Sequence, residues 1–327
     1  MLTIKELKDS IDKLTPKYVP VTIGEFEYIP ALGIEIHGDG LLSKSTGELF
    51  GFADDAAFGN FTTFIGAPGK FLMKLHPEMR KSVVDYMIQK SHELEGTITL
   101  QDNELLNIFK ADQLLLPPDK VVGTVSSLFK DDDVVSQLDF RTGLVMNIRT
   151  SNVETAVKAG DITQGGIRFD TTHGKSPEVS AYMERLVCTN GMVATSDLDK
   201  IPVRGYTLAE VLNSMQHIAD HYLNTSVPHF LENWKKLTDV RSTNPEQLIH
   251  RLSKENDLSP KIETRIIEAA SSLEDSTYYD VINLITSFQH AEGVDQKQVN
   301  KLQILGGNAV RDMGGHRCVN CQHNLDI

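Results

Sequence analysis

The sequence predicts an α+β protein, with an antiparallel β meander in the middle of the chain and a helical C-terminal region. Two observations predict this class. Between positions 134 and 195, short runs rich in apolar and β-branched residues alternate with turn residues, which is typical of consecutive antiparallel strands. After position 206, apolar residues recur every three or four positions, as they do on one face of a helix.

The helices are marked by the residues at their starts. Thr3 and Glu6 form a capping box ahead of an apolar stripe that ends before Pro16, and a capping box stabilises a helix N-terminus by satisfying free backbone N–H groups. Pro77 is expected to open another helix, because proline suits the first helical position. Further starts are predicted at Thr207 with Glu210, Asn244-Pro245, Ser259-Pro260, Thr277 and Asp295.

The predicted strands are bounded by tight turns. The runs 134–140 and 144–148 flank a turn at 141–143, and the run 166–170 precedes a turn at His173-Gly174. Asn190-Gly191 is expected to form a two-residue hairpin loop, since both residues tolerate positive φ. Cys188 lies on the strand before that loop. It is expected to be a small buried hydrophobe rather than a nucleophile, which needs a basic partner.

The simplest organisation has three parts. Residues 1–200 form a mixed α+β region that contains the central sheet, residues 201–310 form a helical region, and residues 311–327 form a tail with a Cys-x-x-Cys motif. With 327 residues and 40% hydrophobic content, the chain is long enough for one large domain or two ordinary ones with real cores. The boundary near Ile201-Pro202 is expected to be a change of layer or a domain break.

The composition restricts the setting of the protein. The formal net charge of −13 argues against a broad nonspecific nucleic-acid surface, although it leaves room for a local basic groove. The chain starts without a charged-then-apolar leader and has no apolar run of the roughly 20 residues that span a bilayer. Three cysteines do not make a disulfide framework. We therefore expect a cytoplasmic protein without a membrane partner.

Two motifs in the middle of the chain carry a family resemblance. The segment from Gly160 to Ile167, followed by the segment from Arg185 to Met192, resembles the core pattern of an uncharacterised phage/plasmid-like protein family found in phages, plasmids and bacterial genomic islands. The segments 278–286 and 302–307 resemble its C-terminal part, so the similarity covers about the last two thirds of the chain. The family motif residues are Gly160, Asp161, Cys188, Asn190 and Gly191. The resemblance implies a mobile-element origin and no particular reaction.

Basic residues of the middle strands are the candidate nucleic-acid-binding residues. On one face of a curved sheet, such side chains hold a phosphate backbone and leave the bases free. The alternative, scattered surface arginines balanced by nearby Asp and Glu, is favoured. The six residues are Arg141, Arg149, Arg168, Lys175, Arg185 and Arg204.

The tail carries the sharpest metal hypothesis. His316, Cys318, Cys321 and His323 are four possible zinc ligands, since a Cys-x-x-Cys knuckle supplies half of a tetrahedral site. The alternative is a mobile terminal segment with adventitious metal affinity. The Asp131-Asp132-Asp133 run is expected to be a solvated loop or helix start rather than a metal site.

Other polar and aromatic motifs have structural interpretations. Gly160-Asp161 and Gly165-Gly166 are expected to form a structural turn rather than a phosphate loop, because strand and not helix follows them. His217 and His221 are expected on a helix face without metal, since the Glu of a zinc-protease motif is missing. Trp234 is expected in a core rather than stacked on a base.

These observations leave two main hypotheses for function. The first is a phage or plasmid nucleic-acid-processing factor, an oligomeric protein that binds or anneals single-stranded DNA. The second is a protein-interaction factor that inhibits or redirects a host defence system or enzyme. A hydrolase or nuclease is least favoured, because the sequence lacks the paired motifs that such an enzyme needs. Enzymatic activity is therefore left open, and its absence is favoured. A homo-oligomer is expected because the C-terminal helices have broad apolar faces.

Overall fold

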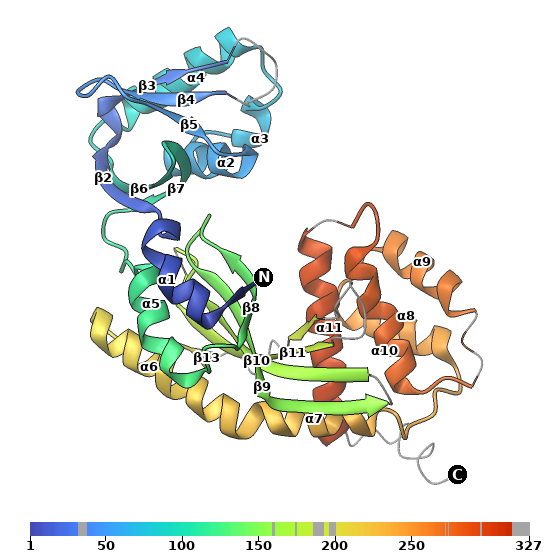
Figure 1. The fold of residues 1–327 in the computed structure, drawn as a ribbon. Coiled ribbons are helices and arrows are strands. Elements are labelled where there is room, and N and C mark those ends of the chain that lie inside the picture. Colours follow the sequence, from blue (N-terminus) through green and yellow to red (C-terminus); the bar gives the residue numbers. More distant parts are fainter. Residues whose placement is uncertain are drawn as a thin grey trace.

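Two β-sheets and a bundle of helices make up the computed structural model (Figure 1). It describes residues 1–31, 38–158, 161–173, 175–185, 193–195, 201–271, 273, 275–294 and 296–315. Each of the three parts encloses its own cluster of buried hydrophobic side chains. The chain therefore builds three cores, of which the central one includes both N-terminal and middle segments.

The central sheet has seven strands in the order β1-β8-β9-β10-β11-β12, with β13 also paired to β11. Every pairing in it is antiparallel, and strands β8 to β12 are neighbours in chain order. The predicted antiparallel meander is therefore confirmed. The strands are β1 (Leu2–Thr3), β8 (Val134–Asp139), β9 (Val145–Lys158), β10 (Asp161–Asp170), β11 (Glu178–Arg185), β12 (Val193–Thr195) and β13 (Ile201–Pro202).

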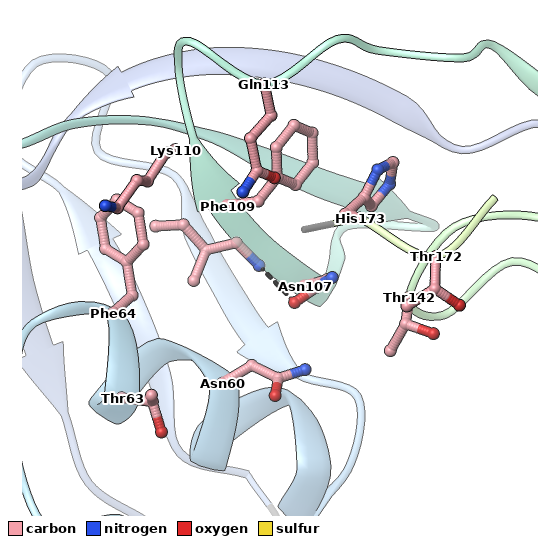
Figure 2. Close-up of a pocket in the computed structure, with 11 residues that line it drawn as sticks. Asn60, Thr63, Phe64, Asn107, Phe109, Lys110, Gln113, Thr142, Thr172 and His173 are labelled. Carbon is pink, nitrogen blue, oxygen red and sulfur yellow. Dashed lines mark hydrogen bonds between the residues drawn. The ribbon is translucent and has the colours of Figure 1, made fainter. Parts of the chain in front are cut away.

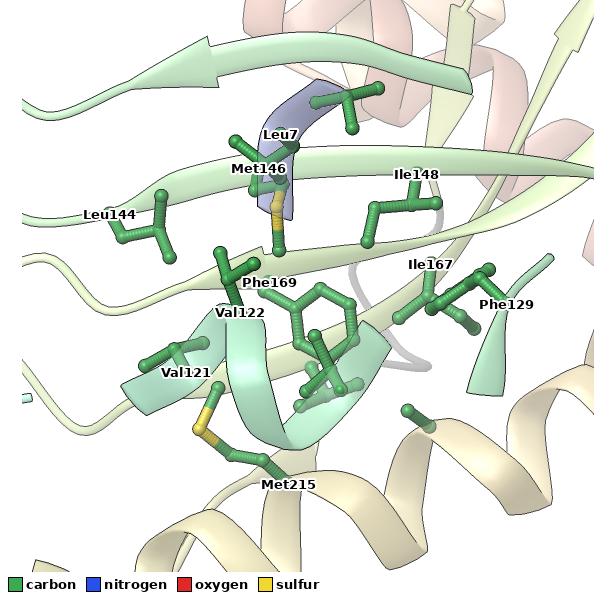
Figure 3. Close-up of a cluster of buried hydrophobic side chains, with 14 of the residues drawn as sticks. Leu7, Val121, Val122, Phe129, Leu144, Met146, Ile148, Ile167, Phe169 and Met215 are labelled. Carbon is green, nitrogen blue, oxygen red and sulfur yellow. The ribbon is translucent and has the colours of Figure 1, made fainter. Parts of the chain in front are cut away.

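Three helices cover one face of the central sheet: α1 (Ile4–Leu14), α5 (Pro118–Val125) and α6 (Leu208–His221). Figure 3 shows their side chains interleaved with those of the strands, for example Met146 and Phe169 with Met215. Helices α1 and α6 start at the predicted capping boxes, in which the threonine hydroxyl accepts a hydrogen bond from the backbone and the glutamate accepts one in return. The central core therefore joins the first residues of the chain to residues beyond 200.

The N-terminal lobe contains a second sheet, with six strands in the order β2-β6-β7-β5-β4-β3. Strands β5 and β7 are parallel and the other neighbours are antiparallel. Its strands are β2 (Lys17–Thr22), β3 (Phe26–Ile29), β4 (Gly40–Ser43), β5 (Leu49–Phe52), β6 (Glu95–Gln101) and β7 (Glu104–Lys110). Helices α2 (Asp55–Phe64), α3 (Gly69–Leu72) and α4 (Pro77–Lys90) belong to the same lobe, and α4 begins at the predicted Pro77.

This lobe is an insertion into the central unit, between α1 and α5 (Figure 1). Its core packs Tyr28, Phe52 and Phe58 together and shares no member with the core under the central sheet. The expectation of one mixed region over residues 1–200 is therefore refined by the structure. Residues 17–110 form a sheet with its own core, and the flanking segments build the central unit.

A fully buried charged cluster holds the lobe together. The guanidinium of Arg80 lies with its Nε 2.9 Å from the Tyr28 hydroxyl and 3.0 Å from Asp39 Oδ2. The Tyr28 hydroxyl also donates to Asp39. Burial, and then the neighbouring carboxylate, raise the pKa of Tyr28, which keeps the phenol protonated as a donor. The cluster thereby joins strand β3, helix α4 and the residue before strand β4.

The C-terminal helices form the third core. They are α7 (Val227–Lys236), α8 (Pro245–Glu255), α9 (Pro260–Ala270), α10 (Tyr278–Ser287) and α11 (Gln296–Gly315). Trp234 is fully buried there, as expected, and its ring centroid lies 4.9 Å from that of Tyr279. Helix α6 belongs to the central core instead, and so does Val227 at the start of α7, so the change from one core to the next falls between Val227 and Phe230, in the first turn of α7. None of the described helices is both long and apolar enough to cross a bilayer.

The chain covers the apolar faces of its own C-terminal helices. In the described part of the chain after residue 200, the large hydrophobic side chains that stay exposed are Ile201 and Tyr206, which both precede helix α6. The uncovered apolar faces that motivated the expected homo-oligomer are thus absent from the described helices. Self-association stays a prediction, which sedimentation velocity at micromolar concentration checks.

Gly165 and Gly166 lie inside strand β10 and not in a turn, which corrects the prediction for this pair. A Cβ on Gly165 would lie 2.0 Å from Cγ1 of Val227, so the missing side chain lets helix α7 approach the sheet. A Cβ on Gly166 would lie 2.2 Å from the Ile148 carbonyl oxygen and 2.6 Å from Cε1 of Tyr182. Both glycines are therefore packing residues, and the register of β10 shifts between Gln164 and Gly166.

The structure describes residues on both strands of the predicted hairpin. Strand β11 pairs antiparallel with β12, with Tyr182 opposite Thr195 and Glu184 opposite Val193. The antiparallel pairing of these two segments agrees with the prediction, but the register does not: a two-residue loop at 190–191 would place residue 188, and not Glu184, opposite Val193. Cys188, Asn190 and Gly191 lie outside the described residues.

Candidate functional site

A cleft lies where the N-terminal lobe meets one end of the central sheet (Figure 2). It consists of two adjoining cavities of about 300 and 280 Å³, which share Gln113, Thr172 and His173 as lining residues. Helix α2 and strand β7 supply the wall on the lobe side. The turn after β8 and the segment after β10 supply the opposite wall. The cleft is thus built from segments that are far apart in the sequence.

Backbone contacts fix the wall that comes from the central sheet. Gly143 has a φ of +127°, and a Cβ at this position would lie 2.3 Å from the Thr171 carbonyl oxygen. The Leu144 N–H donates to the Thr171 hydroxyl at 3.0 Å, and the His173 N–H donates to the Thr142 carbonyl at 2.7 Å. The close approach that Gly143 permits therefore holds His173 in place at the cleft.

His173 forms the aromatic contact between the two sheets. Its ring stacks on Phe109 of β7, with centroids 4.1 Å apart and an interplanar angle of 22°. Tyr18 of β2 meets the same imidazole edge-on at 6.0 Å. Burial lowers the pKa of His173 to about 4, so the imidazole is neutral at pH 7. Burial, with a smaller effect of Asp119, raises the pKa of Tyr18 to about 12.

Three polar atoms at this junction are buried without a hydrogen-bond partner among the described residues: Tyr18 Oη, Gln113 Oε1 and His173 Nε2. Leaving such a group unsatisfied costs about 1–3 kcal/mol in a typical protein. Each of these three atoms has almost no accessible surface, so the atoms lie beneath the wall of the cleft and not on it. Gln113 and His173 line both cavities. Figure 2 shows Asn60 of α2 and Asn107 of β7 reaching into the same space. The lining of the cleft is therefore mixed, with amide side chains beside aromatic ones.

Exposed cations flank the cleft. Lys110, at the end of β7, lines one cavity, and Lys175, after β10, lines the other. Arg141 lies beside the lining residue Thr142 and makes only long ion pairs, at 3.6 Å to Asp54 and 4.0 Å to Asp139. The Asp54 pair crosses from the central unit to the lobe. Of the six predicted cations, Arg141 and Lys175 thus lie at the cleft.

Arg204 lies close to the same end of the sheet. The neighbouring Val203 N–H donates to the Pro177 carbonyl at 2.7 Å, and Pro177 lines the second cavity. Arg204 is exposed, and two residues further on Tyr206 has 99% of its surface in solvent. An exposed basic residue and an exposed aromatic residue therefore follow directly on the wall of the cleft.

Arg149 and Arg168 share the other face of the central sheet, as the sheet hypothesis expected. Arg149 lies opposite Gly166, and Arg168 lies two residues further along the same strand. Each is already paired, however: Arg149 Nη1 lies 3.1 Å from Glu184 Oε1, and Arg168 Nη2 lies 3.7 Å from an oxygen of Asp170. Their side chains are only 15% and 18% exposed. Both arginines are therefore balanced by a carboxylate of the same sheet, although they are neither scattered nor fully exposed as that alternative expected.

The remaining predicted residues give less information. Arg185 ends strand β11 opposite Thr163, and Asp161 begins strand β10 opposite Lys158, but their side chains lie outside the described part of the chain. Gly160 and the possible zinc ligands His316, Cys318, Cys321 and His323 lie outside it as well.

The aspartate run at 131–133 stabilises its own loop. Asp133 is buried and accepts hydrogen bonds from the N–H groups of Lys130 at 2.8 Å and Ser151 at 3.1 Å. Asp131 pairs with Lys8 at 2.8 Å. Over the described ranges of the chain, no group of three or more His, Cys, Asp or Glu side chains is placed to hold a metal ion. The run therefore fastens helix α1 and strand β9 to the loop.

Comparison with known proteins gives no assignment: no family model, no curated protein and no solved structure matches this chain. The argument for function therefore depends on the site itself.

Sequence reasoning missed the lobe side of the cleft. Lys110 and Gln113 follow a strand that was not predicted, and His173 was predicted only as part of a turn. The available signal was a polar stretch after an apolar strand, Lys110-Ala111-Asp112-Gln113. That stretch gives no indication of its partner wall some 60 residues later.

Proposed function

We propose that the protein binds single-stranded DNA in the cleft between the N-terminal lobe and the central sheet, as a nucleic-acid-processing factor of a phage or plasmid. The observation that supports this proposal is the pair of exposed lysines, Lys110 and Lys175, each of which lines one of two adjoining cavities. Proteins that bind single strands combine a cationic groove for the backbone with aromatic side chains for the bases. Arg204 and the solvent-exposed Tyr206 supply a third cation and an aromatic ring next to the cleft.

The charge of the whole chain favours a single strand over a duplex. A formal net charge of −13 opposes a broad surface that tracks two phosphate backbones. A cleft of this size accepts a strand one nucleotide at a time, and only cations near the cleft need to contact phosphate. The proposal therefore assigns the phosphate contacts to the exposed residues Lys110, Lys175 and Arg204. Arg149 and Arg168 are not assigned this role, because each is already paired with a carboxylate.

Fluorescence anisotropy with labelled single-stranded and double-stranded DNA tests this proposal at low and physiological salt. Wild-type protein is expected to prefer the single strand and to lose affinity as salt rises. Replacing Lys110 and Lys175 together by glutamine is expected to reduce the slope of log K against log salt by about 1.4, at about 0.7 per phosphate contact on a single strand. The matched control replaces the exposed Lys254 and Lys261, on helices α8 and α9, by glutamine.

Two results would contradict the proposal. One is the absence of binding to single-stranded DNA at low salt. The other is an equal loss of affinity in the cleft variant and the control variant. That result would mean that DNA is attracted by lysines anywhere on the surface and not bound at the cleft.

A second candidate function is binding to a host protein. The observation that favours it is a set of exposed apolar side chains on the N-terminal lobe, Phe71, Met79 and Tyr86. Met79 and Tyr86 lie seven positions apart on α4 and so share one helix face. A pull-down from host lysate with wild-type protein and with the Met79→Ser/Tyr86→Ser variant tests it. A stoichiometric partner that only the wild type retains would support this function.

A further inference from the structure

Tyr206 is placed where local rules would bury it, yet 99% of its surface is in solvent. It directly precedes Thr207, the N-cap of helix α6. An apolar residue at this position often packs on the residue four positions into the helix, which is Val211 here. Gly205 approaches Val211 instead, because a Cβ on Gly205 would lie 2.8 Å from Cγ2 of Val211. The tyrosine ring is therefore left without a packing contact in the described chain.

The backbone that carries this ring is held on both sides. The Tyr206 N–H donates to Oε2 of Glu210 at 2.8 Å, and the Thr207 N–H donates to the same oxygen at 3.3 Å. The carbonyl of Arg204 accepts a hydrogen bond from the Ser214 hydroxyl at 3.2 Å. The carboxylate of Glu210 thereby faces the backbone, and the ring projects into solvent from an anchored segment.

This segment starts at the wall of the cleft. The Val203 N–H donates to the carbonyl of Pro177, which lines the second cavity together with Lys175. Three residues span at most about 11 Å, so the backbone of Tyr206 lies within about that distance of Val203. Lys175 and Arg204 are both exposed. One aromatic ring and two cations are therefore available to a ligand at this end of the central sheet.

The surroundings of the ring indicate what kind of ligand fits. The core of a protein interface is a contiguous apolar patch, whereas the immediate neighbours of Tyr206 are the glycine at 205 and the polar Thr207. An open aromatic face stacks well on another flat π-system. The cations at 175 and 204 favour a ligand that also has negative charge. A nucleotide of a single strand has both, a flat base and an anionic phosphate.

We propose that Tyr206 is a base-stacking residue of the single-strand site, with one face of its ring on a nucleobase while Arg204 and Lys175 contact the adjoining phosphates. This inference rests on the proposed binding of single-stranded DNA and adds a contact with the bases to it. Because every base has a π-face, the contact tolerates any sequence. Binding then has a component that depends on the bases and not on salt.

The test compares an ordinary oligonucleotide with one of equal length that carries only abasic sites, by fluorescence anisotropy. Tyr206→Ala is expected to bind the ordinary strand at least about fivefold more weakly and the abasic strand like the wild type. Its slope of log K against log salt is expected to stay unchanged, since the lost stacking contact neutralises no phosphate. Tyr206→Phe keeps the ring and is expected to bind both strands like the wild type. Tyr206→Leu keeps an apolar side chain without a π-face and is expected to behave like Tyr206→Ala.

The chain offers a matched control. Tyr86 on helix α4 is also exposed, at 64%, and Tyr86→Ala is expected to bind both strands like the wild type. Since the Tyr206 ring packs on nothing in the described chain, Tyr206→Ala is expected to unfold at the same urea midpoint as the wild type. A loss of binding is then a loss of the contact and not of the fold.

The failures of the two proposals are distinguishable. If wild-type protein binds the ordinary strand and Tyr206→Ala binds it equally well, the stacking contact is refuted and DNA binding stands. A loss that is equally large on the abasic strand, or a Tyr206→Leu variant that binds like the wild type, also refutes stacking alone. If wild-type protein binds no single strand at low salt, the proposed function fails and the stacking contact fails with it.

Discussion

Gly165→Ala tests whether the glycine pair in strand β10 is there for packing. The added Cβ would lie 2.0 Å from Cγ1 of Val227 and 3.6 Å from Cδ1 of Leu231, both on helix α7. Val227 is fully buried, so it has no solvent to rotate into. The helix, the strand or the valine must move.

The expected cost follows from the size of this overlap. Inserting a methyl group into a closely packed core costs about 1–3 kcal/mol, and a methyl–methyl approach of 2.0 Å belongs at the upper end. Val227→Ala removes the obstructing Cγ1 and alone costs about 2 kcal/mol, through two lost methyl groups and a cavity. The double variant is expected to be more stable than the sum of the single effects by about 1–2 kcal/mol, because the added Cβ then occupies the vacated space.

The assay is urea unfolding followed by the fluorescence of Trp234, the single tryptophan of the chain. It is a suitable probe because it lies on helix α7, the same helix as Val227, and is fully buried. The control is Gly123→Ala in helix α5, where a Cβ meets no atom within 4 Å; this change is expected to stabilise by about 0.5–1 kcal/mol. An unchanged midpoint for Gly165→Ala, or a double variant no better than the sum, would refute the packing argument.

Three further outcomes are expected. The pKa of His173 is about 4 in the folded protein and near 6.5 in the unfolded chain, so the unfolded chain takes up the proton first as the pH falls. The free energy of unfolding is therefore expected to fall between pH 6.5 and pH 4, by at most about 3 kcal/mol. Urea midpoints measured at pH 7 and pH 5 are expected to differ less for His173→Phe than for the wild type. Arg80→Met leaves Asp39 buried and unpaired and is expected to cost about 3–5 kcal/mol by thermal unfolding, whereas replacing the exposed Lys254 is expected to cost almost nothing. Thr207→Ala removes the cap of helix α6 and is expected to cost about 1 kcal/mol.

The features that the sequence predicted correctly depend on short-range signals. A capping box brings together residues three apart, and those at Thr3 and Thr207 form as expected. The central meander was predictable for the same reason, because β8 to β12 pair with their neighbours along the chain. Local propensity and turn chemistry are sufficient to specify such pairings.

The lobe and the glycine pair depend on long-range contacts. The parallel pairing of β5 with β7, such as Gly51 opposite Glu104, joins segments about 50 residues apart, and no local pattern indicates it. Gly165 was interpreted as part of a turn, and not of a phosphate loop, because strand and not helix follows it. Its actual reason is Val227, about 60 residues later. The glycine at position 165 is thus explained by packing against helix α7.

The charges of the central sheet show why candidate site residues were harder to predict than the fold. A sequence counts arginines but not their partners, and Arg149 and Arg168 proved to be paired with carboxylates in the same sheet. The cleft residues show the opposite case. Lys110 and Gln113 belong to no recognisable sequence motif, and only the fold places them beside His173. Predicting a site of this kind requires the long-range contacts first.

The position of the cleft follows from how the lobe is inserted. Because the lobe and the central unit have separate cores, a change in their separation need not disrupt either one. The described contacts between them include the stack of His173 on Phe109 and the half-exposed pair of Arg141 with Asp54. These contacts lie at the cleft itself, and the stack supplies part of its wall. A ligand that altered the stack of His173 on Phe109 would therefore also alter the position of the lobe relative to the sheet.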